Sequence, residues 1–138
     1  MELKKLVPAV VVGYALLLAL GYLIHGVWLL PVYRDYAGVW RSETLMMHKR
    51  WVMWVGDLIF TVVFAWVYTR NIENKPWPGQ GIRYGVLMTL LAVVPAACIQ
   101  YVVYPIPYTL ALKWMFAGGV QLIVLGLVVA YFCRKPAS

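Results

Sequence analysis

Charged residues are scarce in this chain. Only 12% of its 138 residues are Asp, Glu, Lys or Arg, whereas 64% are hydrophobic, and the mean hydropathy is +0.78. Soluble globular domains carry about 25% charged and about 45–50% apolar residues. The composition therefore excludes that class and predicts an integral membrane protein.

Several kinds of chemistry are excluded by residues that are missing. The two cysteines, Cys98 and Cys133, have neither C-x-x-C nor zinc-finger spacing, so we expect no disulfide, metal site or thiol catalysis. No long basic run of the kind that binds nucleic acid occurs. No reaction motif is present, and four membrane spans would use nearly every residue. The chain is therefore predicted not to be an enzyme.

Long apolar runs are abundant, in contrast. They occupy residues 6–30, 51–68, 84–104 and 108–132. A helix of about 20 residues crosses a hydrocarbon core of roughly 30 Å, so these runs predict an all-α fold. The fold is a bundle of four transmembrane helices that forms a single domain over residues 1–138. The first run is too long for a signal peptide.

The connecting segments carry their own signals. Between the first two runs, Ser42 and Glu43 can start a helix that continues into the second span. Pro105 and Pro107 leave room only for a tight turn, which predicts that the last two spans form an antiparallel hairpin.

Basic residues indicate the orientation. The segment at 31–50 contains four: Arg34, Arg41, Lys49 and Arg50. The ends of the chain and the segment at 69–83 contain seven: Lys4, Lys5, Arg70, Lys75, Arg83, Arg134 and Lys135. Because cytoplasmic loops are richer in Lys and Arg, both termini are predicted to be cytoplasmic. The expected location is the bacterial inner membrane, which the chain would cross several times.

Each span places one strongly polar residue at a similar depth. These residues are His25, Asp57, Gln100 and Lys113. At about 1.5 Å per residue, all four lie about 6–9 Å inside the outer end of their spans, which suggests one shared polar layer. We expect Asp57 and Lys113 to form an ion pair across the second and fourth spans.

Two interpretations of this layer stay open. The layer can fix helix register, or it can bind a small polar or anionic molecule or relay protons. A third alternative is that His25 and His48 ligate a haem.

Small residues mark surfaces for close helix packing. They are Gly13 and Gly21 in the first span and Gly118 and Gly119 in the last. Glycines let helix backbones approach closely in a membrane, so each pair predicts a helix contact, either inside the bundle or with a partner.

Three motifs, GYLIHGVWLLPVY, VGDLIF and YPIPYTLALKW, resemble those of a loose group of small bacterial four-helix membrane proteins of unknown function. The resemblance covers much of the chain and implies the fold but no activity or cofactor. With almost no mass outside the bilayer, the chain is expected to be an accessory subunit that packs against other membrane subunits or itself. The alternative is a small transporter, or a solute- or cofactor-binding protein, that uses the polar layer.

Overall fold

Helices account for nearly all of the computed structural model, which describes residues 3–135. The first span consists of α1 (Leu3–Gly21) and the π-helical η1 (Tyr22–Trp28), and it is followed by the short helices α2 (Leu30–Asp35) and η2 (Ala37–Val39). The remaining elements are α3 (Glu43–Arg70), α4 (Trp77–Met88), the π-helical η3 (Thr89–Val93), α5 (Val94–Val103) and α6 (Tyr108–Cys133). No strand occurs among the described residues.

Four continuous helices are long and apolar enough to cross a membrane. They are Leu3–Trp28, Glu43–Arg70, Trp77–Val103 and Tyr108–Cys133. The all-α, four-helix prediction is therefore confirmed, and these helices are those of a multi-pass membrane protein.

The second and third helices begin about two turns before the apolar runs that identified them. The second starts at Glu43, where the Ser42 hydroxyl accepts a hydrogen bond from the Leu45 amide at 3.4 Å. This confirms the helix start at Ser42 and Glu43, because the side-chain oxygen satisfies one of the unpaired amides of the first turn. The third starts at Trp77, with Pro78 in its first turn, a position where the missing amide costs nothing.

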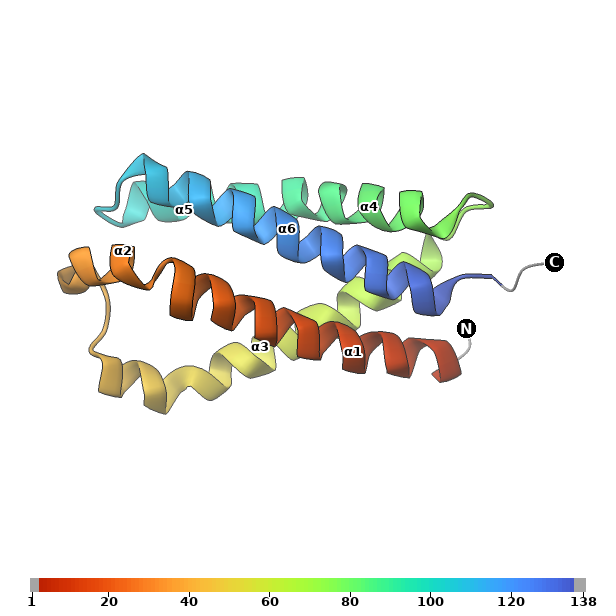
Figure 1. Ribbon diagram of the computed structural model, residues 1–138, viewed down its shortest axis with the longest axis horizontal. Coiled ribbons are helices and arrows are strands. Elements are labelled where there is room, and N and C mark those ends of the chain that lie inside the picture. Colours follow the sequence, from red (N-terminus) through yellow and green to blue (C-terminus); the bar gives the residue numbers. More distant parts are fainter. Residues whose placement is uncertain (1–2, 136–138) are drawn as a thin grey trace.

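The hairpin of the last two spans is also confirmed. The chain leaves α5 at Tyr104 and re-enters a helix at Tyr108, so the rod of α4, η3 and α5 lies antiparallel beside α6 (Figure 1). Pro95 is the second residue of α5, which follows η3. The wider π-helical turn changes the backbone hydrogen-bonding pattern next to the position where proline lacks an amide donor.

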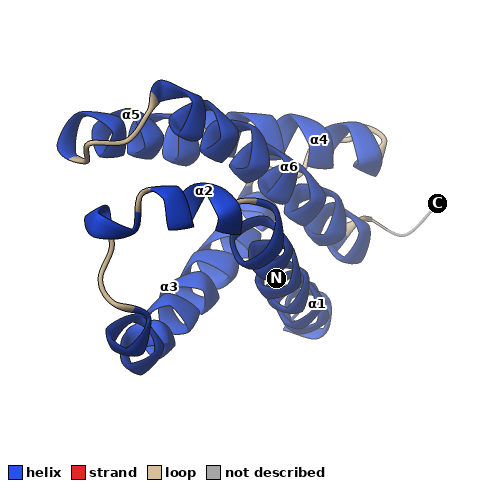
Figure 2. Cartoon of the chain, turned by 60° about the vertical axis from the view of Figure 1, so that its left-hand side comes forward, coloured by secondary structure: helices blue, strands red, loops and turns tan. Residues whose placement is uncertain are grey.

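Both ends of the described chain lie at the same end of the bundle, which we call the terminal end (Figure 1). There the Lys5 ammonium donates to the carbonyl of Arg134 at 3.3 Å. The opposite end, which holds α2, η2 and the turn before α6, is the distal end. Seen from that side, α3 runs obliquely, and its first half stands apart from α1 and α2 (Figure 2).

The closest helix contact joins α4 to α6. A Cβ atom built on Gly126 would lie 2.3 Å from the backbone oxygen of Gly81, and one built on Gly85 would lie 2.5 Å from the Cα of Ile123. Neither neighbour is a movable side chain, so only glycine fits. The main core lies beside this contact and comprises Ala9, Phe64, Ala65, Tyr68, Leu122, Leu125, Val129, Ala130 and Cys133.

The glycines that the sequence singled out also face the chain's own helices. A Cβ on Gly13 would lie 2.7 Å from Leu125, and one on Gly118 would lie 2.5 Å from Val93. The corresponding distances are 3.4 Å from Gly119 to Thr89 and 3.7 Å from Gly21 to Gln121. These surfaces are therefore occupied inside the bundle and are not available to a partner.

Candidate functional site

The first half of α3 has no covered face. Every residue from 43 to 56 is exposed, over roughly four turns at 3.6 residues per turn. We call residues 43–56 the outer α3 surface. Its large side chains include Trp51, Met53 and Trp54, which are 61%, 66% and 49% exposed. A helix in a bundle ordinarily buries one stripe of its surface, and this half of α3 buries none.

The second half of α3 behaves differently. Its buried residues are Thr61, Phe64, Ala65 and Tyr68. The Tyr84 hydroxyl of α4 donates to the carbonyl of Phe64 at 2.7 Å, which attaches this half to the bundle. On the distal side the Tyr14 hydroxyl of α1 reaches the carbonyl of Trp54 at 2.9 Å. The helix therefore changes from packed to exposed near Asp57.

Asp57 lies at that change and is half-buried. Its backbone carbonyl accepts a hydrogen bond from the Thr61 hydroxyl at 2.7 Å. Its carboxylate forms no ion pair with Lys113, so the predicted pairing is wrong. The reason is geometric: the buried positions of α3 begin at Thr61 and all lie in its second half, and Asp57 precedes them.

The four polar residues of the predicted layer are placed separately. His25 and Gln100 are exposed, whereas Asp57 and Lys113 are half-buried. Among residues 3–135, no hydrogen bond or ion pair joins any two of the four. The similar depths in the sequence do not bring the side chains into one contacting group.

His25 instead contacts Tyr33. The Nδ1 atom of His25 lies 2.6 Å from the Tyr33 hydroxyl, which also accepts a hydrogen bond from the Trp114 indole at 2.8 Å. The Trp40 indole donates to the backbone carbonyl of Tyr33 at 3.2 Å. We call His25, Tyr33, Trp40 and Trp114 the Tyr33 cluster.

The rings of this cluster are also in contact. Tyr33 and Trp40 have ring centroids 5.5 Å apart, and Trp40 and Trp114 have centroids 6.3 Å apart, both in edge-on arrangements. Burial raises the pKa of the Tyr33 hydroxyl, and the hydrogen bond from Trp114 partly opposes that shift. The cluster joins the first span, the segment after it and α6 at the distal end, and its polar atoms bind one another.

Sequence reasoning did not identify Tyr33 or Trp114 as partners of His25. The available signal was the spacing of eight residues from His25 to Tyr33 across Pro31. The π-helical η1 contains His25, and α2 follows with Pro31 in its first turn. π-Helical turns are uncommon and occur often at functional positions, but apolar periodicity does not reveal them.

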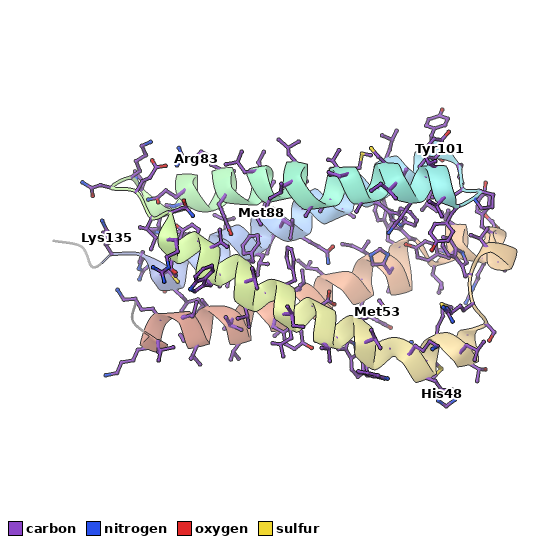
Figure 3. The ribbon with its side chains drawn as sticks, turned by 180° about the vertical axis from the view of Figure 1, so that it is seen from behind. His48, Met53, Arg83, Met88, Tyr101 and Lys135 are labelled. Carbon is purple, nitrogen blue, oxygen red and sulfur yellow. The ribbon has the colours of Figure 1, made fainter. Side chains whose placement is uncertain are left out.

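The haem alternative gains no support from this geometry. His25 is bound to Tyr33, and His48 points away from the rest of the chain (Figure 3). The two imidazoles therefore do not face each other across the bundle. Among the described residues, no group of three or more His, Cys, Asp or Glu side chains is placed to hold a metal ion.

The segment between α3 and α4 is held in a fixed conformation. The side-chain oxygen of Gln80 accepts a hydrogen bond from the backbone amide of Glu73 at 2.9 Å. The side-chain nitrogen of Gln80 donates to the backbone carbonyls of Glu73 and Lys75 at 3.0 and 2.5 Å. The Glu73 carboxylate pairs with Lys75 at 2.6 Å and with Arg83. The hydrogen bond from Lys75 is the largest cause that lowers the pKa of the Glu73 carboxyl group, and the hydrogen bond from Arg83 lowers it further. Desolvation acts in the opposite direction and raises this pKa.

Comparisons with protein families, with curated proteins and with solved structures gave no match for this chain.

Proposed function

We propose that this protein is an accessory subunit that packs against a larger assembly in the bacterial inner membrane. The observation that carries the proposal is the outer α3 surface, where every residue from 43 to 56 is exposed. The docking helix of the partner would lie along Trp51, Met53 and Trp54.

Two further features favour a partner over lipid alone. The Asp57 carboxylate is half-buried at the end of this surface and has no ion-pair partner in the described chain. A carboxylate at membrane depth is costly unless a donor or a cation reaches it, and a partner helix can supply one. The glycines of α1 and α6 that the sequence singled out already pack inside the bundle, so a partner would bind larger side chains, such as those of the outer α3 surface.

The test compares two sets of three alanine substitutions. The first set removes large side chains from the outer α3 surface through Trp51→Ala, Met53→Ala and Trp54→Ala. The control set, Ile99→Ala, Val102→Ala and Val103→Ala, shortens side chains of α5 that are 63%, 82% and 65% exposed. If α3 is the docking surface, subunits that co-purify with the wild type in mild detergent are lost from the first variant and kept by the control.

The same unpaired Asp57 supports a second candidate, a transporter or solute-binding protein. In that case the carboxylate would bind a solute or a proton on the exposed side of α3. Wild-type protein purified as a lone species, with solute-driven proton movement in liposomes that Asp57→Asn abolishes, would replace the accessory-subunit proposal.

The proposal includes cytoplasmic termini, which places the loop between α3 and α4 in the cytoplasm. Asn74 is an exposed residue of that loop. An Asn74→Cys variant in a Cys98→Ala background is expected to react with an impermeant thiol reagent only after the cytoplasmic face is opened. Reaction in intact cells would reverse the orientation. Native Cys133 is a poor reporter because it is only 5% exposed.

A further inference from the structure

A cavity lies at the terminal end, where the start of α1 meets the ends of α3 and α6. Its volume is about 300 Å³, at the lower limit of the range of roughly 300–1,000 Å³ typical of small-molecule sites. Three basic residues, Lys5, Arg70 and Lys135, come to it from three different parts of the chain. The cavity therefore depends on the folded bundle.

The remaining lining is largely apolar. Leu6, Ile72 and Cys133 line the same cavity. Cys133 belongs to the buried core, and Leu6 and Ile72 pack against that core. The cavity thus combines cationic side chains with an apolar wall that continues into the bundle.

Two of the cations are held by contacts with the protein. The Arg70 guanidinium lies over the ring of Trp66, with its central carbon 5.2 Å from the ring centroid. The Lys5 ammonium donates to the carbonyl of Arg134 at 3.3 Å and so joins α1 to the residue after α6. The Arg134 side chain itself lies over Tyr131, 4.1 Å from the ring centroid, and is not part of the lining.

The positive charge of the residues that line this cavity exceeds the partial negative charge of the helix ends around it. Helices α3 and α6 both end here, and each C-terminus carries about half a negative charge, whereas the start of α1 carries about half a positive one. Against this net value of about −0.5, Arg70 and Lys135 alone contribute two positive charges to the lining, and none of the described lining residues is acidic. The excess predicts an anionic ligand.

The position of the cavity indicates the class of anion. It lies at the ends of three helices of membrane-spanning length, which is the level of the lipid headgroups. Basic pockets between membrane helices bind anionic headgroups, and Arg and Lys form strong charge-assisted hydrogen bonds with phosphate oxygens. We propose that this cavity binds the phosphate diester of an anionic phospholipid, with Arg70 and Lys135 on the phosphate and the apolar wall against the start of the acyl chains.

The experiment measures phospholipid binding to the full chain in neutral detergent by native mass spectrometry. The probes are dioleoylphosphatidylglycerol, dioleoylphosphatidylcholine and inorganic phosphate. The wild type is expected to retain phosphatidylglycerol in preference to phosphatidylcholine. Arg70→Gln with Lys135→Gln is expected to weaken phosphatidylglycerol binding about tenfold or more, since each basic residue near a membrane surface contributes on the order of 1 kcal/mol.

A matched control removes the same charge at the same end. Lys75→Gln with Arg83→Gln also deletes two cations, and Arg83 lies at the end of the molecule that holds Lys135 (Figure 3). These residues pair with Glu73 and do not line the cavity, so phosphatidylglycerol binding should change by less than about twofold, as expected for a general surface-charge effect. Arg70→Lys with Lys135→Arg keeps the charge and should retain most of the affinity.

Three results would overturn the proposal. Equal retention of the two lipids would show that the cavity does not select anions. Equal losses in the two neutralised variants would show that only general surface charge matters. Binding of inorganic phosphate that displaces phosphatidylglycerol and depends on Arg70 and Lys135 would identify a soluble phosphate ligand instead. If the double variant does not fold, Lys135→Gln alone still gives the comparison, because Lys135 lies beyond the last helical residue.

Discussion

The terminal and distal ends of the bundle are packed in different ways. Toward the terminal end, Gly81 and Gly126 bring α4 and α6 into backbone contact, and the second half of α3 buries Phe64 and Ala65. Toward the distal end, the outer α3 surface touches the rest of the chain so little that every residue from 43 to 56 is exposed. The two halves of one helix, α3, therefore have different surroundings.

The difference shows what determines helix association in a bilayer. Lipid tails are as apolar as Leu or Val side chains, so hydrophobicity alone does not favour contact between helices. Close packing depends on small residues that admit a neighbouring backbone. Those residues occur in α4 and α6, whereas the first half of α3 presents Trp51, Met53 and Trp54.

The largest expected effect on stability comes from disrupting the glycine contact between α4 and α6 toward the terminal end. In Gly126→Ala, the new Cβ would lie 2.3 Å from the backbone oxygen of Gly81, so α4 and α6 must separate. Overpacking of this kind costs about 1–3 kcal/mol, occasionally more. The measurement is thermal unfolding in detergent, followed by circular dichroism.

The matched control is Gly56→Ala on the outer α3 surface. Nothing lies within 4 Å of a Cβ built there, and alanine favours helix by roughly 1 kcal/mol over glycine. The melting temperature should stay the same or rise slightly. Similar losses in the two variants would contradict the packing difference between the ends.

The next effect concerns the distal end, where polar contacts replace glycine packing. Tyr33→Phe removes the hydroxyl that binds the Trp114 indole and His25. The indole donor is then left without its partner, at a cost of about 1–3 kcal/mol. Tyr36→Phe is the control, since no hydrogen bond of its hydroxyl is formed within the described chain. Equal melting temperatures for the two variants would show that the Tyr33 cluster does not hold the distal end together.

A smaller effect is expected at the exposed Glu73 pairs of the terminal end. The pKa of Glu73 is lowered from its ordinary value of 4.5, chiefly by the hydrogen bond with Lys75. The stabilisation is therefore complete above pH 4.5 and is lost as the pH falls through the lowered pKa. Glu73→Gln should flatten the dependence of the melting temperature on pH below about 4.5. An unchanged slope would show that these pairs do not contribute.

The smallest expected quantity is the coupling between Asp57 and Lys113. Since the two form no ion pair, the effects of Asp57→Asn and Lys113→Met on stability should add within about 0.5 kcal/mol in a double-mutant cycle. A larger coupling measured in lipid would mean that the first half of α3 approaches α6 in the membrane, and the contrast between the two ends would then be smaller than the structure shows.

The helices were the part of the fold that could be predicted from the sequence. Apolar runs identified four spans, Ser42 and Glu43 marked the start of α3, and Pro105 with Pro107 required the last hairpin. Each of these features depends on neighbouring residues: hydropathy over about 20 positions, a side chain that caps the nearby amides, and prolines that exclude helix.

The candidate site could be predicted only in part. The depths of His25, Asp57, Gln100 and Lys113 came from counting residues along straight helices, and that count contains no information about the angle at which α3 crosses the bundle. The pairing of His25 with Tyr33 depends on the π-helical η1 and on the position of α6, which brings Trp114 to the same hydroxyl.

The sequence alone determined that the chain forms four apolar helices and where three of their boundaries lie, because those properties follow from local composition. Only the tertiary structure decided which helix faces meet. Gly81 and Gly126 close the terminal end, α3 diverges toward the distal end, and Lys5, Arg70 and Lys135 gather around one cavity. The physical reason is that helices in a bilayer associate through shape and polar contacts between residues distant in sequence, which no single segment specifies.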